Sequence, residues 1–131
     1  MTLSPVEWEI LTSANEDWHG LWEALASIRS AFPDLTEDEV LETGKSTVRS
    51  LLDKGLIYLC WFRHGTNQET RLSTNEGKQL IEDPARWDPP DWGDRYVAFA
   101  ATAAGERAWM KPRPTLSTLR KRHETKSPSP G

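Results

Sequence analysis

The residues best suited to chemistry in this sequence are basic side chains clustered between positions 43 and 72. Five Lys and Arg stand there against two acidic residues, a local charge of +3. Such side chains neutralise phosphates, and a guanidinium can pair bidentately with the edge of guanine. The stretch therefore predicts contact with nucleic acid, with Arg49 as the best candidate for touching a base. The five basic residues are Lys45, Arg49, Lys54, Arg63 and Arg71.

A short helix, from about Ser46 to Lys54, is predicted to present most of these side chains. Its apolar residues Val48, Leu51 and Leu52 share one face, which we expect to be core. Gly55 then ends the helix, and the β-forming run after it predicts a strand over residues 57–62. The opposite face and its flanks would offer a hydroxyl- and amine-rich surface to phosphates. This surface comprises Lys45, Ser46, Thr47, Arg49, Ser50 and Lys54.

The run from Lys45 to Ile57 resembles the recognition helix and following strand of winged helix-turn-helix regulators, such as the MarR and PadR families. The shared pattern is Ser-Thr-Val, two variable residues, Leu-Leu, two variable residues and Gly-Leu-Ile. The likeness extends over about residues 4–110 and is specific over residues 36–62. It implies an α+β winged helix that binds double-stranded DNA as a transcriptional regulator or accessory factor. The helix would enter the major groove, and a wing carrying Arg63, His64 and Arg71 would contact the DNA backbone or minor groove.

Two segments resemble the Leu-Thr-x-x-Gly stretch that follows the wing in those families. One spans residues 71–77 and the other residues 101–107. We favour the second, because residues 96–101 form a strand long enough to pair with residues 57–62, whereas residues 69–72 are barely a strand. Residues 64–94 would then be an enlarged wing insertion beside a small β-sheet.

Helix-start signals predict where the other helices of the chain begin. Capping boxes open helices at Ser4, Thr36 and Ser73, each with a glutamate three residues later. Asp17 is expected to cap a second helix whose apolar face includes Trp18 and which stops at Pro33. Gly44 is expected to break the chain between a short acidic helix and the helix at 46–54. We expect four tryptophans to lie in the core: Trp8, Trp18, Trp22 and Trp61.

Charge divides the 131-residue chain into two parts. Residues 1–110 carry a net charge of -9 and residues 111–131 carry +5, which together give the overall -4. The second part is rich in proline, serine and threonine and has no apolar periodicity, so we expect a flexible tail after one folded domain. Its basic residues Arg120, Lys121 and Arg122 would add salt-sensitive attraction to DNA.

Several functions are excluded by what the sequence lacks. No run is long and apolar enough for a membrane span, and the first residues do not resemble a secretory signal. The lone Cys60 cannot form an internal disulfide, which favours the cytoplasm, and we expect it to be a small buried residue. Gly44-Lys45-Ser46 imitates a P-loop without its glycine-rich cradle. No metal site, cofactor or catalytic grouping is supported, so we expect no enzyme.

The competing interpretation is a winged helix that binds another protein and no DNA. The acidic body and the acidic run at residues 37–39 favour it. Trp87 and Trp92 flank Pro89-Pro90 and would be the partner-binding residues, although we favour a role in pinning this loop to the body. The sequence leaves a homodimer open as well.

Overall fold

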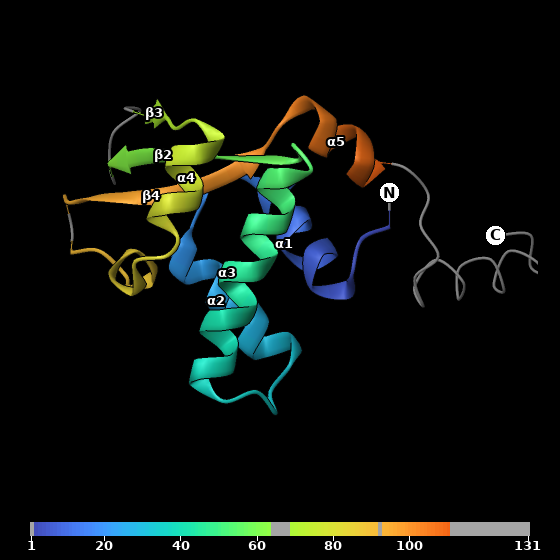
Figure 1. Cartoon of the computed structure of the whole chain (residues 1–131), viewed down its shortest axis with the longest axis vertical. Helices are drawn as coiled ribbons and strands as arrows, with labels where there is room; N and C mark the ends of the chain where they lie inside the picture. Colours follow the sequence, from blue (N-terminus) through green and yellow to red (C-terminus); the bar gives the residue numbers. More distant parts are fainter. Residues whose placement is uncertain (1, 64–68, 92, 111–131) are drawn as a thin grey trace, which may run out of the picture.

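The computed structural model describes residues 2–63, 69–91 and 93–110 (Figure 1). It confirms the α+β class: five α-helices accompany a four-stranded antiparallel sheet with strand order β1-β4-β2-β3. The expected tail, residues 111–131, lies outside the described part of the chain. The elements are α1 (Pro5–Glu16), β1 (His19–Gly20), α2 (Leu21–Ala31), α3 (Glu37–Asp53), β2 (Ile57–Arg63), β3 (Glu69–Arg71), α4 (Thr74–Leu80), the 3-10 turn η1 (Pro84–Trp87), β4 (Arg95–Ala101) and α5 (Ala103–Met110).

The three capping boxes predicted from the sequence are all present. At α1, the backbone N–H of Glu7 donates to Ser4 Oγ at 3.2 Å, and the backbone N–H of Ser4 donates to Glu7 Oε1 at 2.9 Å. The same reciprocal pair opens α3 and α4. Each box satisfies backbone donors that a helix cannot pair within itself, so these helix starts are encoded locally.

The expected second helix begins later than its sequence pattern indicates. Trp18 lies outside it, because His19 and Gly20 form β1 and pair with Phe99 and Ala98 of β4. The helix α2 starts only at Leu21. Pairing with a strand almost 80 residues away has no local signature, so the apolar spacing alone extended the helix too far.

The break predicted at Gly44 is wrong, since α3 runs without interruption from Glu37 to Asp53. A Cβ atom on Gly44 would lie 2.7 Å from Leu25 Cδ2 and 3.1 Å from the Trp87 ring. An interior glycine costs a helix about 1 kcal/mol relative to alanine. Here the glycine allows α2 and η1 to approach α3 closely, and that packing offsets the cost.

The central pair of the sheet is β2 with β4, which are joined along all seven residues of each strand, as the longer of the two candidate strands predicted. The shorter β3 pairs with β2 at three positions. Gly55 turns the chain from α3 into β2 with a φ of 71°, a backbone conformation that glycine adopts easily. The core takes its strand residues from alternate positions, including Leu59, Val97 and Phe99.

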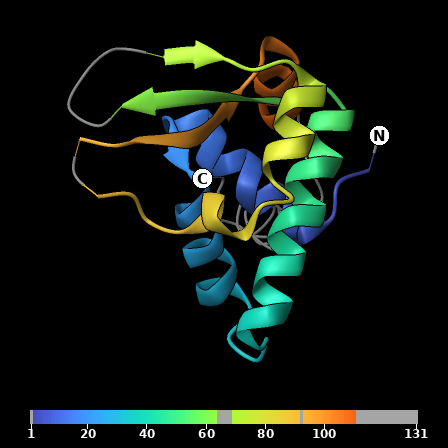
Figure 2. The ribbon, with the colours of Figure 1, turned by 60° about the vertical axis from the view of Figure 1, so that its left-hand side comes forward.

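The segment between β3 and β4 folds back onto the core face of the sheet, next to α3 (Figure 2). In α4, Gly77 lies against Leu59 of β2, and Ile81 just after it is fully buried. In η1, Trp87 is 2% exposed and its indole N–H donates to the carbonyl of Ile81 at 2.8 Å. The expected insertion is therefore an integral layer of the domain.

We expect Gly44→Val to destabilise the protein by about 1–3 kcal/mol, because the new side chain overlaps Leu25 and Trp87. Urea unfolding followed by circular dichroism measures this difference. The matched control is Glu42→Val, which places the same residue on an exposed position of α3. An equal loss in both variants would show that β-branching in the helix, and not the close approach, is responsible.

Candidate functional site

The polar residues predicted to form one DNA-contacting surface on α3 point in different directions. Thr47 is only 6% exposed and belongs to the buried layer, so it is not presented to solvent with the other predicted residues. The Lys45 side chain is 12% exposed, and its Nζ lies 3.9 Å from a carboxylate oxygen of Glu42. Ser46 is exposed, but its hydroxyl donates to the carbonyl of Thr43 at 3.2 Å.

The insertion forms two ion pairs with α3. Arg49, the residue expected to contact a base, forms an ion pair with Glu82, just after α4. Next to it, Lys78 of α4 donates to Asp53 Oδ1 at 2.7 Å. In the first pair α3 supplies the cation, and in the second it supplies the carboxylate. The positive charge of Arg49 is therefore balanced by a carboxylate of the same chain.

On the opposite side, Ser50 and Lys54 are held by Glu7 of α1. The Ser50 hydroxyl donates to Glu7 Oε2 at 2.8 Å, and Lys54 Nζ donates to the same oxygen at 2.5 Å. Burial on its own would raise the pKa of the Glu7 carboxyl. The hydrogen bonds from Lys54, from the Ser4 backbone and from Ser50 outweigh burial and hold that pKa below its usual value.

Of the expected wing residues, the described Arg63 and Arg71 have their contacts on the sheet and in the loop before β4. Arg71 lies on one face of the sheet, with its guanidinium carbon 4.2 Å from the centre of the Tyr58 ring. Arg63 ends β2 on the alternate face, where its Nη1 donates to the carbonyl of Gly93 at 2.6 Å. His64 lies outside the described residues, and the tail residues Arg120, Lys121 and Arg122 do as well.

The two tryptophans proposed as a partner-binding loop have different outcomes. Trp87 is buried against α2 and α3, which agrees with the favoured role of pinning the loop to the body. Its indole N–H is satisfied within the protein. Trp92 lies outside the described residues.

A layer of aromatic side chains covers the sheet face that turns away from the core. We call it the aromatic face. The Trp18 and Phe62 ring centroids are 5.1 Å apart, and Phe62 and Tyr96 are 5.7 Å apart. Trp22 meets Tyr96 edge-on at 4.9 Å, and the Trp18 indole N–H donates to the Tyr58 hydroxyl at 3.1 Å. The aromatic face consists of Trp18, Trp22, Tyr58, Phe62 and Tyr96.

Small residues lie beneath the rings of this layer. Cys60 and Ala98 face each other across β2 and β4 and are fully buried. Trp18 reaches from the β1 edge to contact Tyr58 and Phe62, which flank Cys60 on this face. Trp18 therefore covers the centre of the sheet and is itself 37% exposed.

Trp22 occupies the space that a side chain at position 20 would need. A Cβ atom on Gly20 would lie 1.8 Å from the Trp22 ring. The ring fills the gap beside β1 because glycine leaves it empty, and from there it reaches Tyr96. The first turn of α2 thus contributes the outermost ring of the aromatic face.

Two titratable groups at this face have raised pKa values. Burial, and then the neighbouring Glu69 carboxylate, raises the pKa of the Cys60 thiol to about 12. Burial also raises the pKa of the Tyr96 hydroxyl, with smaller contributions from the carboxylates of Glu23 and Asp17. Both shifts favour uncharged forms, so the layer itself is neutral at physiological pH.

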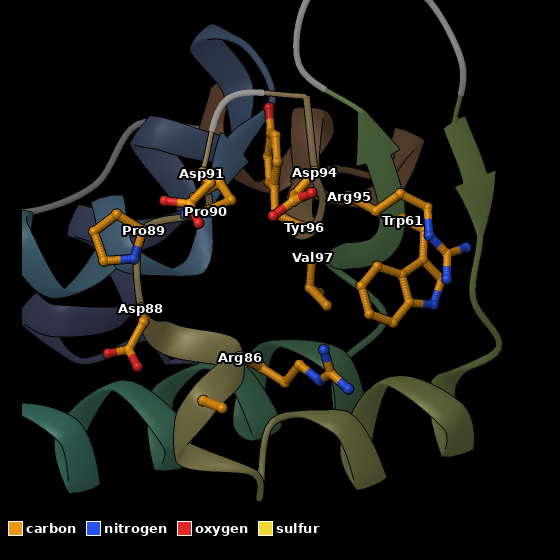
Figure 3. Close-up of a pocket in the computed structure, with 11 residues that line it drawn as sticks. Trp61, Arg86, Asp88, Pro89, Pro90, Asp91, Asp94, Arg95, Tyr96 and Val97 are labelled. Carbon is orange, nitrogen blue, oxygen red and sulfur yellow. The ribbon is translucent and has the colours of Figure 1, made fainter.

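A separate pocket of about 230 Å³ lies between η1, the loop after it and the central strands β2 and β4 (Figure 3). Trp61 lines it, with the guanidinium carbons of Arg86 and Arg95 at 5.1 and 4.6 Å from its ring centre. Carboxylates of the loop and of the residue before β4 contribute the opposite charge. The two guanidinium groups already stack on Trp61, and the lining carries both signs of charge. The pocket therefore selects no single class of ligand. The acidic lining residues are Asp88, Asp91 and Asp94.

The sequence carried a signal for the aromatic face that the strand prediction did not use. Residues 57–62 are apolar at every position, whereas a strand with one solvated face alternates apolar and polar residues. Together with Trp18 and Tyr96, this pattern indicates that both faces of the sheet are covered by apolar side chains. The prediction for Trp18 as a core helix residue is accordingly wrong.

Comparison with known proteins found no matching family, no matching curated protein and no matching solved structure. In residues 2–63, 69–91 and 93–110, no cluster of three or more His, Cys, Asp or Glu side chains could hold a metal ion. None of the helices in these ranges is long and apolar enough to cross a membrane.

We expect Glu7→Gln to destabilise the protein by about 1–3 kcal/mol at pH 7, because Lys54 loses its charged partner while glutamine can keep the capping box. The pKa of Glu7 is lower in the folded protein than its ordinary 4.5. Its stabilisation is therefore complete above that value and is lost as the pH falls through the folded pKa. Urea unfolding at pH 7 and pH 3 should show the difference shrinking in acid, and a difference independent of pH would contradict the assignment.

We expect the Cys60 thiol to resist alkylation in the folded protein. With a pKa of about 12, roughly one thiol in 10,000 is ionised at pH 8. Trp18→Ala opens the layer above it and should raise the iodoacetamide reaction rate at least about ten-fold. Mass spectrometry of timed samples measures the rate. Equal rates in both proteins would show that Trp18 does not cover Cys60.

Proposed function

We propose that this chain is a winged-helix-like protein-interaction module, and that it binds a protein partner through the aromatic face. The observation that carries the proposal is the exposure of Trp18 in a five-ring layer, where it contacts Phe62 and Tyr58. Large apolar side chains gathered on one face of a domain mark interaction surfaces, and tryptophan and tyrosine contribute most of the binding energy at such surfaces. A cytoplasmic location agrees with a single reduced cysteine.

The order of elements supports a winged-helix-like arrangement. A helix, a short strand and two helices precede the β2–β4 pair, and β1 joins the far edge of β4. In this arrangement α3 corresponds to the recognition helix, and β3, α4 and η1 are the enlarged insertion. The insertion packs against α3 through α4.

Binding of duplex DNA through α3 is the competing proposal, and the charges of the domain weigh against it. Arg49 and Lys54 each have a carboxylate partner, and Glu37, Asp38 and Glu39 form the first turn of α3. A phosphate would have to displace the carboxylate partners of Arg49 and Lys54. It would also have to approach the acidic first turn of α3. Arg63 and Arg71 lie on opposite faces of the sheet and offer no second basic surface continuous with α3.

The experiment compares two ligand classes on the full chain. Affinity capture with the wild-type chain should recover a partner that mass spectrometry identifies and that binds again as a purified protein. Trp18→Ala should weaken that purified interaction at least about ten-fold. The matched control is Met110→Ala, which removes the other exposed large apolar side chain of the described residues, at 77% exposure.

The same preparation is tested with a labelled DNA duplex at low and moderate salt. We expect no shift, and no difference after Arg49→Ala combined with Lys45→Ala. A duplex complex that the double variant loses would overturn the proposal and restore α3 as a DNA-binding helix. Loss of the protein partner in Met110→Ala, but not in Trp18→Ala, would also overturn it.

A further inference from the structure

Acidic side chains border the aromatic face. The Asp17 carboxylate accepts the backbone N–H of Trp18 at 2.7 Å, and the Glu23 carboxylate accepts that of Gly20 at 3.0 Å. Glu69 lies opposite Phe62 in the register of β3 with β2. The basic side chain in ring contact with this face is Arg71. The border is therefore acidic by about three charges to one.

Arg71 shows what kind of cation the rings accept. Its guanidinium stacks over Tyr58, with the central carbon 4.2 Å from the ring centre. The same protein repeats this contact on Trp61 with Arg86 and Arg95. A planar guanidinium suits an aromatic ring because its flat face matches the ring and its weak hydration makes the loss of water less costly.

We propose that the aromatic face binds an extended, arginine-containing basic segment of a partner protein. This inference rests on the proposed function and specifies its partner. One arginine stacks on the exposed Trp18 ring, as Arg71 does on Tyr58. The carboxylates of Asp17 and Glu69, at the two sides of the layer, pair with the charges of the segment and fix its direction across the strands.

Charge separates this occupant from the alternatives. A nucleic-acid strand could stack its bases on the rings, but its phosphates would meet the acidic border of the face. A second copy of the chain would bring the same acidic border against itself, because a two-fold interface pairs each patch with its own equivalent. A basic peptide satisfies both the rings and the carboxylates.

Fluorescence anisotropy with the full chain tests the inference. The probe is a short fluorescein-labelled peptide in which arginines alternate with glycine and serine. We expect saturable binding that weakens as salt is added. A lysine peptide of equal charge should bind at least about five-fold more weakly, because an ammonium group cannot stack on a ring as a planar guanidinium does.

Variants of the protein locate the contact. Trp18→Ala should weaken binding at least about ten-fold, and Trp18→Phe, which keeps a ring, should remain within about three-fold. Asp17→Asn combined with Glu69→Gln should weaken binding about five-fold and reduce its salt dependence. Met110→Ala should bind like the wild type. Thermal unfolding shows whether each variant is folded. If Trp18→Ala is not folded, Trp18→Phe still tests the position.

Three results would overturn the inference. Equal binding of the lysine and arginine peptides would reduce it to unspecific charge attraction. Tighter binding of single-stranded DNA or an acidic peptide would assign the face to another ligand. A dimer in light scattering that Trp18→Ala dissolves would give the face to a second copy.

The chain's own basic residues are the intramolecular competitor. Replacing Arg113, Arg120, Lys121 and Arg122 with serine should leave peptide affinity unchanged. A gain in affinity would show that these residues occupy the face, and would overturn binding of a partner. If the peptide fails but a purified partner still depends on Trp18, the proposed function stands and the arginine chemistry is wrong.

Discussion

The pairing of β2 with β4 is the constraint on which the rest of the structure depends. Side chains alternate along both strands, so the seven-residue register divides them into a core set and an outer set. Leu59, Val97 and Phe99 join the helices, whereas Phe62 and Tyr96 form the aromatic face. A slip of one residue would exchange the two sets, burying phenol groups and exposing the core. Fold and candidate surface are thus two results of one register.

Features encoded by neighbouring residues were predictable from the sequence, and features set by distant contacts were not. The capping boxes at Ser4, Thr36 and Ser73 were correct because each needs only four consecutive residues. Gly44 was misinterpreted because its role depends on Leu25 and Trp87, which approach it from other elements. The α+β class and the strand pairing followed from β-forming runs, whose length and composition are local properties.

The candidate site shows the same division more sharply. The sequence grouped basic residues by their proximity along the chain, but charge acts through space, and Arg49 is balanced by Glu82 from the insertion. Lys54 is balanced by Glu7, 47 residues earlier. A local charge of +3 was therefore a correct count and a poor guide to surface potential. Trp18 was missed because an exposed aromatic residue has no signature in helical spacing.

The contact between Gly20 and Trp22 restricts how this protein can evolve. A single methyl group at position 20 would displace the Trp22 ring, and with it the edge contact to Tyr96. Gly20 is also the N-cap of α2, where its backbone N–H donates to Glu23 Oε1 at 3.0 Å, and a methyl group on its Cα would leave that backbone donor in place. A substitution of Gly20 could therefore disrupt the ring arrangement of the aromatic face while the domain stays folded. Selection for the aromatic face would be visible first as intolerance of alanine at this position.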